Sequence, residues 1–307
     1  MRVVFFGTPG FAVPSLRALL DAGHDVAAVV TQPDRPQGRS RSLLVPPAVK
    51  EIALAHRIPV LQPERPVGDL FIETLRRAQA DIGVVVAYGH ILRPAVLEVP
   101  PGGMVNVHAS LLPRWRGAAP IQAAILAGDP VTGVSIMEME AGLDSGPVLL
   151  RATTPVGAEE TAGELADRLA RLGADTLLEA VGLLEDGSAR PEPQDDAAAT
   201  FAPKVTREAA RLDWMRDAAA LARATRAYDP APGAWAFRDG EPVKLFHGSA
   251  VPGDGEPDTV LAAGDTLRVA TGAGALEVRE VQPAGKRRMP VAEWTRGRGV
   301  APGTRLG

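Results

Sequence analysis

The residues best suited to chemistry are Asn106 and His108, which lie two positions apart in an apolar run that begins at Met104. Residues two apart in a β-strand point to the same face, so the carboxamide and the imidazole would project together, away from Val105 and Val107. A carboxamide can donate a hydrogen bond to a developing oxyanion, and an imidazole can transfer a proton near neutral pH. The spacing alone is equally consistent with two polar groups that are satisfied inside a core.

A carboxylate that could orient such a histidine is Asp144, within the glycine-flanked run Gly142–Gly146. Glycines on both sides allow a tight turn that aims one carboxylate. A single Asp in a glycine-rich loop is usually a turn residue. Asp144 becomes a candidate because its loop follows an apolar run at Val134–Met137, a predicted strand that we expect beside the strand of His108.

Two further segments are placed to contact a ligand. Residues 110–120 leave the strand of Asn106 and His108 and contain two prolines, two arginines and a tryptophan. Rigid, irregular backbone beside a catalytic strand exposes amides and carbonyls to a ligand. Residues 87–92 follow another buried run and would form a wall of the same pocket.

Basic side chains could contact phosphate at two places. Arg35, Arg39 and Arg41 lie in a long polar loop after the second predicted strand, and a run of three basic residues includes Lys286 and Arg287. Basic residues on a loop at the edge of a sheet can bind phosphate, although a solvated surface loop is the more common role.

These candidates need a scaffold of buried strands, and the apolar runs predict one that alternates with helices. Strands are expected at Val3–Phe6, Val26–Val30, Ile82–Ala87, Met104–Val107 and Val134–Met137, and helices at Pro14–Ala22, Pro46–His56, Leu70–Ala78 and Pro120–Ala127. This alternation is typical of an α/β fold, an open, mostly parallel twisted sheet with right-handed crossovers. Ligands on such sheets bind at the carboxyl ends of the strands.

The chain is long enough for two domains. A capping-box pattern at Thr161–Glu164 predicts a helix that ends near residue 185, and residues 186–203 lack a sustained period and are interpreted as a linker. Short strand candidates separated by turns then predict a small β-barrel of the OB type. We therefore divide the chain into a catalytic domain at 1–185, a linker at 186–203 and a C-terminal domain at 204–307.

Composition excludes several classes of protein. The 307 residues include no cysteine, which excludes a disulfide framework, a thiolate nucleophile and a cysteine-based zinc site. The run Gly7–Gly10 lacks the second glycine of a dinucleotide-binding loop, so a nicotinamide enzyme is rejected. No apolar stretch approaches the length of a membrane span. A net charge of -4 argues against a protein that coats nucleic acid, although the slightly basic C-terminal third hints at a polyanionic partner. We expect a cytoplasmic monomer without a membrane anchor.

Taken together, these segments resemble the methionyl-tRNA formyltransferases over nearly the whole chain. The run Ser110–Gln122 is the most specific part of the resemblance, whereas Asn-x-His with a distal Asp is shared by folate-dependent formyltransferases generally. The other segments that carry it are Phe6–Pro9, Thr31–Pro36, Val86–Gly89, Gly142–Gly146 and Gln282–Lys286. The chain departs from the family pattern at Gly10, Ala109, Ser145 and Pro147, outside the candidate catalytic residues.

The resemblance implies a Rossmann-like formyltransferase core with an OB-type tRNA-binding domain. The reaction would transfer a formyl group from 10-formyltetrahydrofolate to the α-amino group of methionine on initiator tRNA, without a metal. Asn106, His108 and Asp144 would form the catalytic trio. The implied folate contacts are Ser110, Leu111, Leu112, Pro113, Tyr88, Gly89 and Ile91, and the implied tRNA contacts are Arg35, Arg39, Arg41, Lys286 and Arg287.

Two alternatives stay open at this point. In the first, the same formyl transfer acts on a nucleotide amino sugar. In the second, the protein only binds nucleic acid, and its N-terminal sheet is a catalytic domain that has lost its activity. The intact Asn-x-His and Asp set argues against the second alternative. The C-terminal part argues against the first, since sugar formyltransferases are not expected to carry it in this form.

Overall fold

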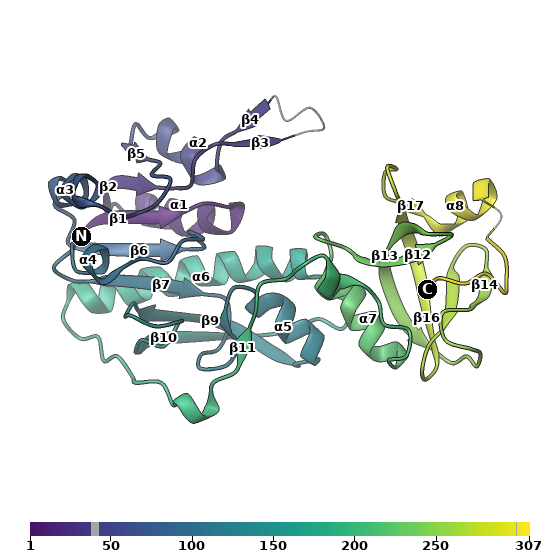
Figure 1. Cartoon of the computed structure of the whole chain (residues 1–307). Helices are drawn as coiled ribbons and strands as arrows, with labels where there is room; N and C mark the ends of the chain where they lie inside the picture. Colours follow the sequence, from purple (N-terminus) through teal and green to yellow (C-terminus); the bar gives the residue numbers. More distant parts are fainter. Residues whose placement is uncertain (38–42, 299) are drawn as a thin grey trace. The chain divides into compact units, whose positions relative to one another are not determined.

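The computed structural model describes residues 1–37, 43–298 and 300–307 (Figure 1). It divides into two compact units, each with its own core. Unit 1 comprises Met1–Gly117, Val131–Pro155 and Ala166–Phe201, and unit 2 comprises Ala118–Pro130, Val156–Leu165 and Ala202–Gly307.

A seven-stranded sheet forms the centre of unit 1, in the order β10-β9-β7-β6-β1-β2-β5. Its strands are β1 (Arg2–Gly7), β2 (Asp25–Val30), β5 (Val60–Leu61), β6 (Ile82–Val86), β7 (Met104–His108), β9 (Val131–Glu138) and β10 (Val148–Pro155). Five of them, β1, β2, β5, β6 and β7, run parallel to one another, which confirms the predicted mostly parallel sheet.

The last two strands of this sheet reverse direction. β9 runs antiparallel to β7, and β10 runs antiparallel to β9. These two strands are the antiparallel part of the mostly parallel sheet that the sequence predicts. The helix between β7 and β9, α5 (Pro120–Ala127), belongs to unit 2, where its residue Leu126 packs against the core of that unit.

The two faces of the sheet are covered by different helices. Val3 and Phe5 of β1 lie in a core with α1 (Val13–Asp21), α2 (Ala48–Ala55) and the C-terminal part of α6 (Ala162–Glu185). The alternate residues Val4 and Phe6 lie in a second core with α3 (Asp69–Arg77) and α4 (Pro94–Leu97). Because both faces are buried, the strands are continuous apolar runs without polar alternation.

Unit 2 contains an antiparallel sheet in the order β12-β13-β16-β15-β14, with β17 paired to β16. Its elements are α7 (Ala218–Ala227), β12 (Ala234–Arg238), β13 (Glu241–Val251), β14 (Val260–Ala263), β15 (Leu267–Ala270), β16 (Ala275–Pro283), β17 (Met289–Pro290) and α8 (Val291–Arg298). This arrangement confirms the predicted C-terminal β domain. The predicted capping box of α6 is also present, since the Thr161 amide donates to Glu164 (2.9 Å) and the Glu164 amide donates to Thr161 (3.2 Å).

The predicted linker makes regular contacts within unit 1. Residue Glu192 and Val148 exchange two backbone hydrogen bonds, of 2.8 and 2.9 Å, so this segment extends the pairing beyond β10. Short elements complete the fold: β3 (Arg35–Gln37), β4 (Leu43–Val45), β8 (Arg116–Gly117), β11 (Phe201–Ala202) and the 3-10 turns η1 (Gly10–Ala12), η2 (Asp196–Ala198) and η3 (Glu208–Ala210). The exact domain limits stay a prediction.

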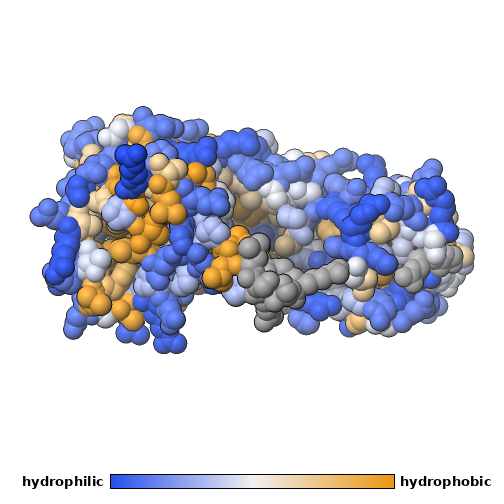
Figure 2. Space-filling model, turned by 90° about the horizontal axis from the view of Figure 1, so that it is seen from above, coloured by the Kyte–Doolittle hydropathy of each residue, from blue (hydrophilic) through white to orange (hydrophobic). Residues whose placement is uncertain are grey.

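The surface differs between the units. Among the described residues, the large hydrophobic side chains that stay exposed lie in unit 1, with the exception of Met215. On the face shown in Figure 2, hydrophobic surface likewise gathers on the side of unit 1, and unit 2 is largely hydrophilic. In the part of the chain that the structure describes, no helix is long and apolar enough to cross a membrane.

Candidate active site

Strand β7 presents Asn106 and His108 on one face of the sheet. Val105 and Val107 lie in the core that includes α6, while Met104 lies in the opposite core. Asn106 and His108 share the side of Met104, as the two-residue spacing predicts. Asn106 is partly exposed, and its carboxamide makes no hydrogen bond with another described residue. This amide is therefore available to a ligand.

The imidazole of His108 is buried, and each of its nitrogens faces an oxygen. Nε2 lies 2.9 Å from the carbonyl oxygen of Trp115, and Nδ1 lies 3.7 Å from Oδ2 of Asp144. A neutral imidazole donates through one nitrogen only, whereas the cation donates through both. Donation through Nε2 accounts for the contact with Trp115, whereas the 3.7 Å from Nδ1 to Asp144 is longer than a hydrogen bond.

The strand order of the sheet does not by itself place Asp144 beside His108. Because β9 is antiparallel to β7, it ends at Glu138, opposite Val105, near the beginning of β7. The loop 139–147 must then run back along the sheet face to bring Asp144 to His108. Its backbone is tightly folded: Asp144 has φ +50°, and a Cβ at Gly146 would lie 2.0 Å from the carbonyl oxygen of Glu138.

The carboxylate of Asp144 has a second contact that fixes its direction. Oδ2 accepts a hydrogen bond of 2.8 Å from the backbone amide of Gly117. The same oxygen that faces His108 is thus held by the loop that leaves β7. The structure brings Asp144 to His108, and Asn106 lies two residues before His108 on the same face of β7; their catalytic roles stay a prediction.

The segment Ser110–Pro113 is fastened to the protein through its own polar groups. Ser135 donates to the carbonyl of Ser110 (2.7 Å) and accepts from the amide of Leu112 (3.0 Å), and Arg151 donates to the carbonyl of Leu112 (3.0 Å). Ser110 and Leu112 are buried, whereas Leu111 and Pro113 are partly exposed. A folate contact of this segment stays a prediction, and Leu111 and Pro113 are the members with exposed surface.

The predicted pocket wall after β6 combines a buried ring with an exposed side chain. Tyr88 is 1% exposed and packs edge-on against Phe6, and burial raises the pKa of its hydroxyl to about 12. Among the described residues this hydroxyl has no hydrogen-bond partner. Ile91, by contrast, is 88% exposed. Tyr88 therefore shapes the wall from inside, whereas Gly89 and Ile91 are exposed and can touch a ligand.

Gln32 is a buried residue that links this wall to Arg35, and the sequence analysis did not identify it as a site residue. Its Nε2 donates to the carbonyl of Tyr88 (3.0 Å), and its Oε1 accepts a hydrogen bond from Arg35. A Cβ at Gly89, which has φ +83°, would lie 2.5 Å from the same nitrogen, so only glycine permits this approach. The available signal was a pair of polar residues, Thr31 and Gln32, at the carboxyl end of the buried strand β2.

The predicted phosphate-binding residues differ in their partners. Arg35 is exposed and contacts Gln32, while Arg39 and Arg41 lie outside the described residues. Nη2 of Arg287 donates to both carboxylate oxygens of Glu293, at 2.7 and 2.8 Å. No such partner faces Lys286 in the described part of the chain. Lys286 is therefore better placed than Arg287 to meet a phosphate without first breaking an internal pair.

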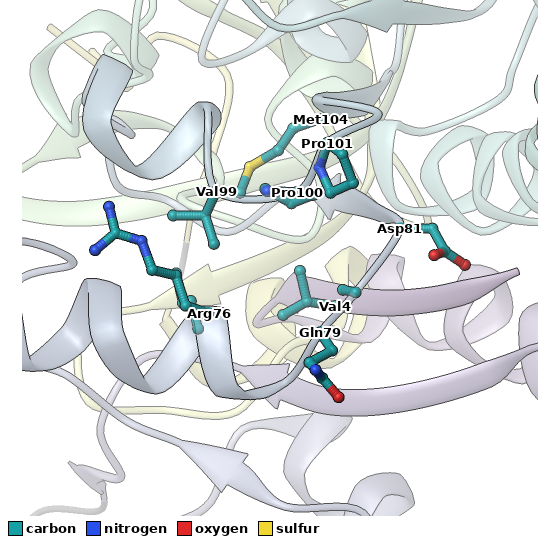
Figure 3. A pocket seen from close by; sticks show the side chains of 10 residues that line it. Val4, Arg76, Gln79, Asp81, Val99, Pro100, Pro101 and Met104 are labelled. Carbon is teal, nitrogen blue, oxygen red and sulfur yellow. The ribbon is translucent and has the colours of Figure 1, made fainter.

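A pocket of about 290 Å³ lies elsewhere, at the amino-terminal edge of the sheet (Figure 3). Val4 of β1, Asp81 before β6 and Met104 at the start of β7 line it together with Arg76 and Pro100. None of the predicted site residues lines this pocket. Within the residues that the structure describes, no cluster of His, Asp and Glu is arranged to hold a metal ion.

Comparison with solved structures shows the fold. An N-formyltransferase from Helicobacter canadensis, in complex with folinic acid and dTDP-3-aminofucose, superposes with a TM-score of 0.70 at 15% identity and covers 92% of this chain and 98% of its own. HypX from Aquifex aeolicus, in complex with tetrahydrofolic acid, gives a TM-score of 0.65 at 21% identity over 96% of this chain and 47% of its own.

Sequence comparison is more specific. Residues 1–181 match the formyl transferase family, and residues 204–299 match the formyl transferase C-terminal domain. The chain is 48% identical over 311 residues to a methionyl-tRNA formyltransferase of Thiobacillus denitrificans, with 100% of both chains covered. It is 50% identical to one of Halorhodospira halophila, with 98% of both chains covered. The chain therefore belongs to the methionyl-tRNA formyltransferase family.

Proposed function

We propose that this chain transfers the formyl group of 10-formyltetrahydrofolate to the α-amino group of methionine on initiator tRNA. The observation that carries the proposal is the convergence of Asn106, His108 and Asp144 in a chain whose full-length relatives are methionyl-tRNA formyltransferases. A tetrahydrofolate-based donor is supported by a protein of the same fold that binds tetrahydrofolic acid. We also propose that the chain acts as a monomer in the cytoplasm and needs no metal.

The three side chains divide the chemistry between them. As the methionine nitrogen bonds to the formyl carbon, negative charge develops on the formyl oxygen, and the partly exposed amide of Asn106 donates a hydrogen bond to it. The amine must lose a proton and the departing folate nitrogen must gain one. His108 transfers it through Nδ1, because Nε2 is engaged by Trp115 and the 3.7 Å from Nδ1 to Asp144 is longer than a hydrogen bond. Asp144 orients the ring and balances its charge.

The acceptor is held by basic residues on two segments. Arg35, Arg39 and Arg41 would contact phosphates near the acceptor end of the tRNA, and Lys286 and Arg287 would contact its backbone from the C-terminal unit. Each phosphate contact releases counterions, so tRNA binding should weaken steeply as salt rises. A flat salt response would contradict these contacts.

The decisive experiment supplies the chain with 10-formyltetrahydrofolate and one acceptor at a time. Methionyl initiator tRNA should yield N-formylmethionine after hydrolysis, whereas a nucleotide amino sugar should stay unmodified. Formylation of the sugar but not of the tRNA would move this chain to the alternative acceptor class. Formylation of neither acceptor would contradict the proposed activity.

A further inference from the structure

Residue Gln194, in the segment that the sequence predicts to be a linker, reaches the loop of Asp144. Its Nε2 donates two hydrogen bonds, to the carbonyl of Asp144 (2.9 Å) and to the carbonyl of Gly146 (2.7 Å). Its Oε1 accepts a hydrogen bond of 3.0 Å from Nε of Arg116. Both amide hydrogens and the amide oxygen are thus engaged, which is the pattern of a residue that clamps a loop.

The clamped backbone is strained. Asp144 has φ +50° and Trp115 has φ +62°, in the left-handed region that residues other than glycine rarely adopt. These are the residues whose oxygens face the two nitrogens of His108. Such conformations persist only where the surrounding structure holds them, and they cluster at functional sites.

The residues that follow Gln194 hold the second strained loop. Asp196 pairs with the guanidinium of Arg116 at 2.8 Å. Thr200 accepts hydrogen bonds from the amide of Trp115 at its side chain (2.9 Å) and from the amide of Arg116 at its carbonyl (2.8 Å). Gln194, Asp196 and Thr200 therefore support the two loops whose oxygens flank the imidazole.

We propose that Gln194 is a positioning residue for formyl transfer, holding the strained loop so that the carboxylate of Asp144 faces His108. This inference rests on the catalytic role proposed above for Asp144. Gln194 has no direct contact with His108, so it acts through the loop and not on the reacting atoms.

The test is a double-mutant cycle between Gln194 and Asp144, measured as kcat and as KM for donor and acceptor. Gln194→Ala should lower kcat by about 10- to 100-fold, because small displacements of catalytic groups cost that much, and both KM values should change less than about twofold. In an Asp144→Ala background, Gln194→Ala should reduce kcat by less than about twofold further, since the group that it positions is already absent. An equal loss in both backgrounds would overturn the inference.

Two further variants separate positioning from folding. Gln194→Glu keeps an acceptor for Arg116 but faces two carbonyl oxygens without a donor, so it should lose kcat like the alanine variant, and its melting temperature shows that the protein still folds. A Gln194→Glu enzyme with normal kcat would contradict the clamp, even if the alanine variant does not fold. The matched control is Asp195→Ala, which removes only the acceptor of a 3.0 Å hydrogen bond from Ala197, and its kcat should stay normal.

The two proposals fail in different ways. If Asp144→Ala itself turns over normally, the proposed catalytic role of Asp144 is wrong. If Asp144→Ala is inactive but Gln194→Ala and Gln194→Glu are normal, only the positioning inference is overturned.

Discussion

Strand β7 and the loop 139–147 bring their functional side chains to the same place by different means. On β7, the pleat alone puts Asn106 and His108 on one face, and neighbours on both sides hold the strand through backbone pairing. The loop has no such ladder. Asp144 keeps its position through contacts from other segments, including the amide of Gly117 and the side chain of Gln194.

The difference shows where each kind of site is vulnerable. A strand position tolerates changes in distant segments, because its geometry comes from the sheet. A loop position that is far from its partner in the sequence depends on every segment that supports it. We therefore expect substitutions on β7 to remove chemistry without affecting the fold, and substitutions around the loop to affect both.

The largest expected effect is on β7. His108→Ala should reduce kcat by about 10²–10⁴-fold, as expected for a residue that transfers a proton, and Asn106→Ala by about 10²–10³-fold, as expected for an oxyanion donor. Both variants should keep a normal melting temperature. Steady-state kinetics with His56→Ala as the control checks this, because His56 is exposed and outside the site. Near-normal turnover of His108→Ala would end its assignment.

Asp144→Asn tests the charge of the loop residue separately from its shape. The carboxamide oxygen can still accept from Gly117, so the loop should stay folded, but the negative charge opposite His108 is lost. We expect kcat to fall by about 10- to 100-fold, with KM values nearly unchanged. A loss in KM without a loss in kcat would instead indicate that Asp144 binds a substrate.

Gly146→Ala tests how tightly the loop is folded. An added Cβ would meet the carbonyl oxygen of Glu138 at 2.0 Å, so the backbone must shift, at a cost of about 1–3 kcal/mol of stability. Activity should fall along with the melting temperature. The matched control is Gly182→Ala in helix α6, where a Cβ has open space and should stabilise by about 0.5–1 kcal/mol. Equal melting temperatures for the two variants would contradict this account.

The smallest expected effect concerns Asp34, whose carboxylate accepts hydrogen bonds from Gln62 and Lys50. Hydrogen bonds from Gln62 (2.7 Å) and Lys50 (2.8 Å) lower the pKa of the Asp34 carboxyl below its ordinary value of 3.8. A lowered pKa means that its contribution to stability is present above about pH 4 and is lost as the pH falls through the folded-state value. Asp34→Asn should therefore lower the melting temperature slightly at pH 7, and the difference from the parent should shrink at pH 3. A difference that grows in acid would refute this sign.

Local patterns were sufficient where neighbouring residues decide the outcome. The buried strands, the capping box at Thr161 and the shared face of Asn106 and His108 follow from spacing, because pleat and helix period repeat over a few residues. The direction of β9 did not follow, since α5 has the sequence of a crossover helix but packs in unit 2. Nor did the contact of Gln32 with the carbonyl of Tyr88, which joins residues far apart in the chain.

The order of the residues is enough to show which chemical groups this protein carries and which of them share a strand face. Tertiary structure alone decided that Asp144 meets His108 and that Gln194, in a segment without regular periodicity, supports that meeting. The cause is the separation in sequence between the residues that interact. Strand and helix geometry is fixed by adjacent peptide units, whereas the position of a strained loop is fixed by hydrogen bonds from residues as many as 50 positions away.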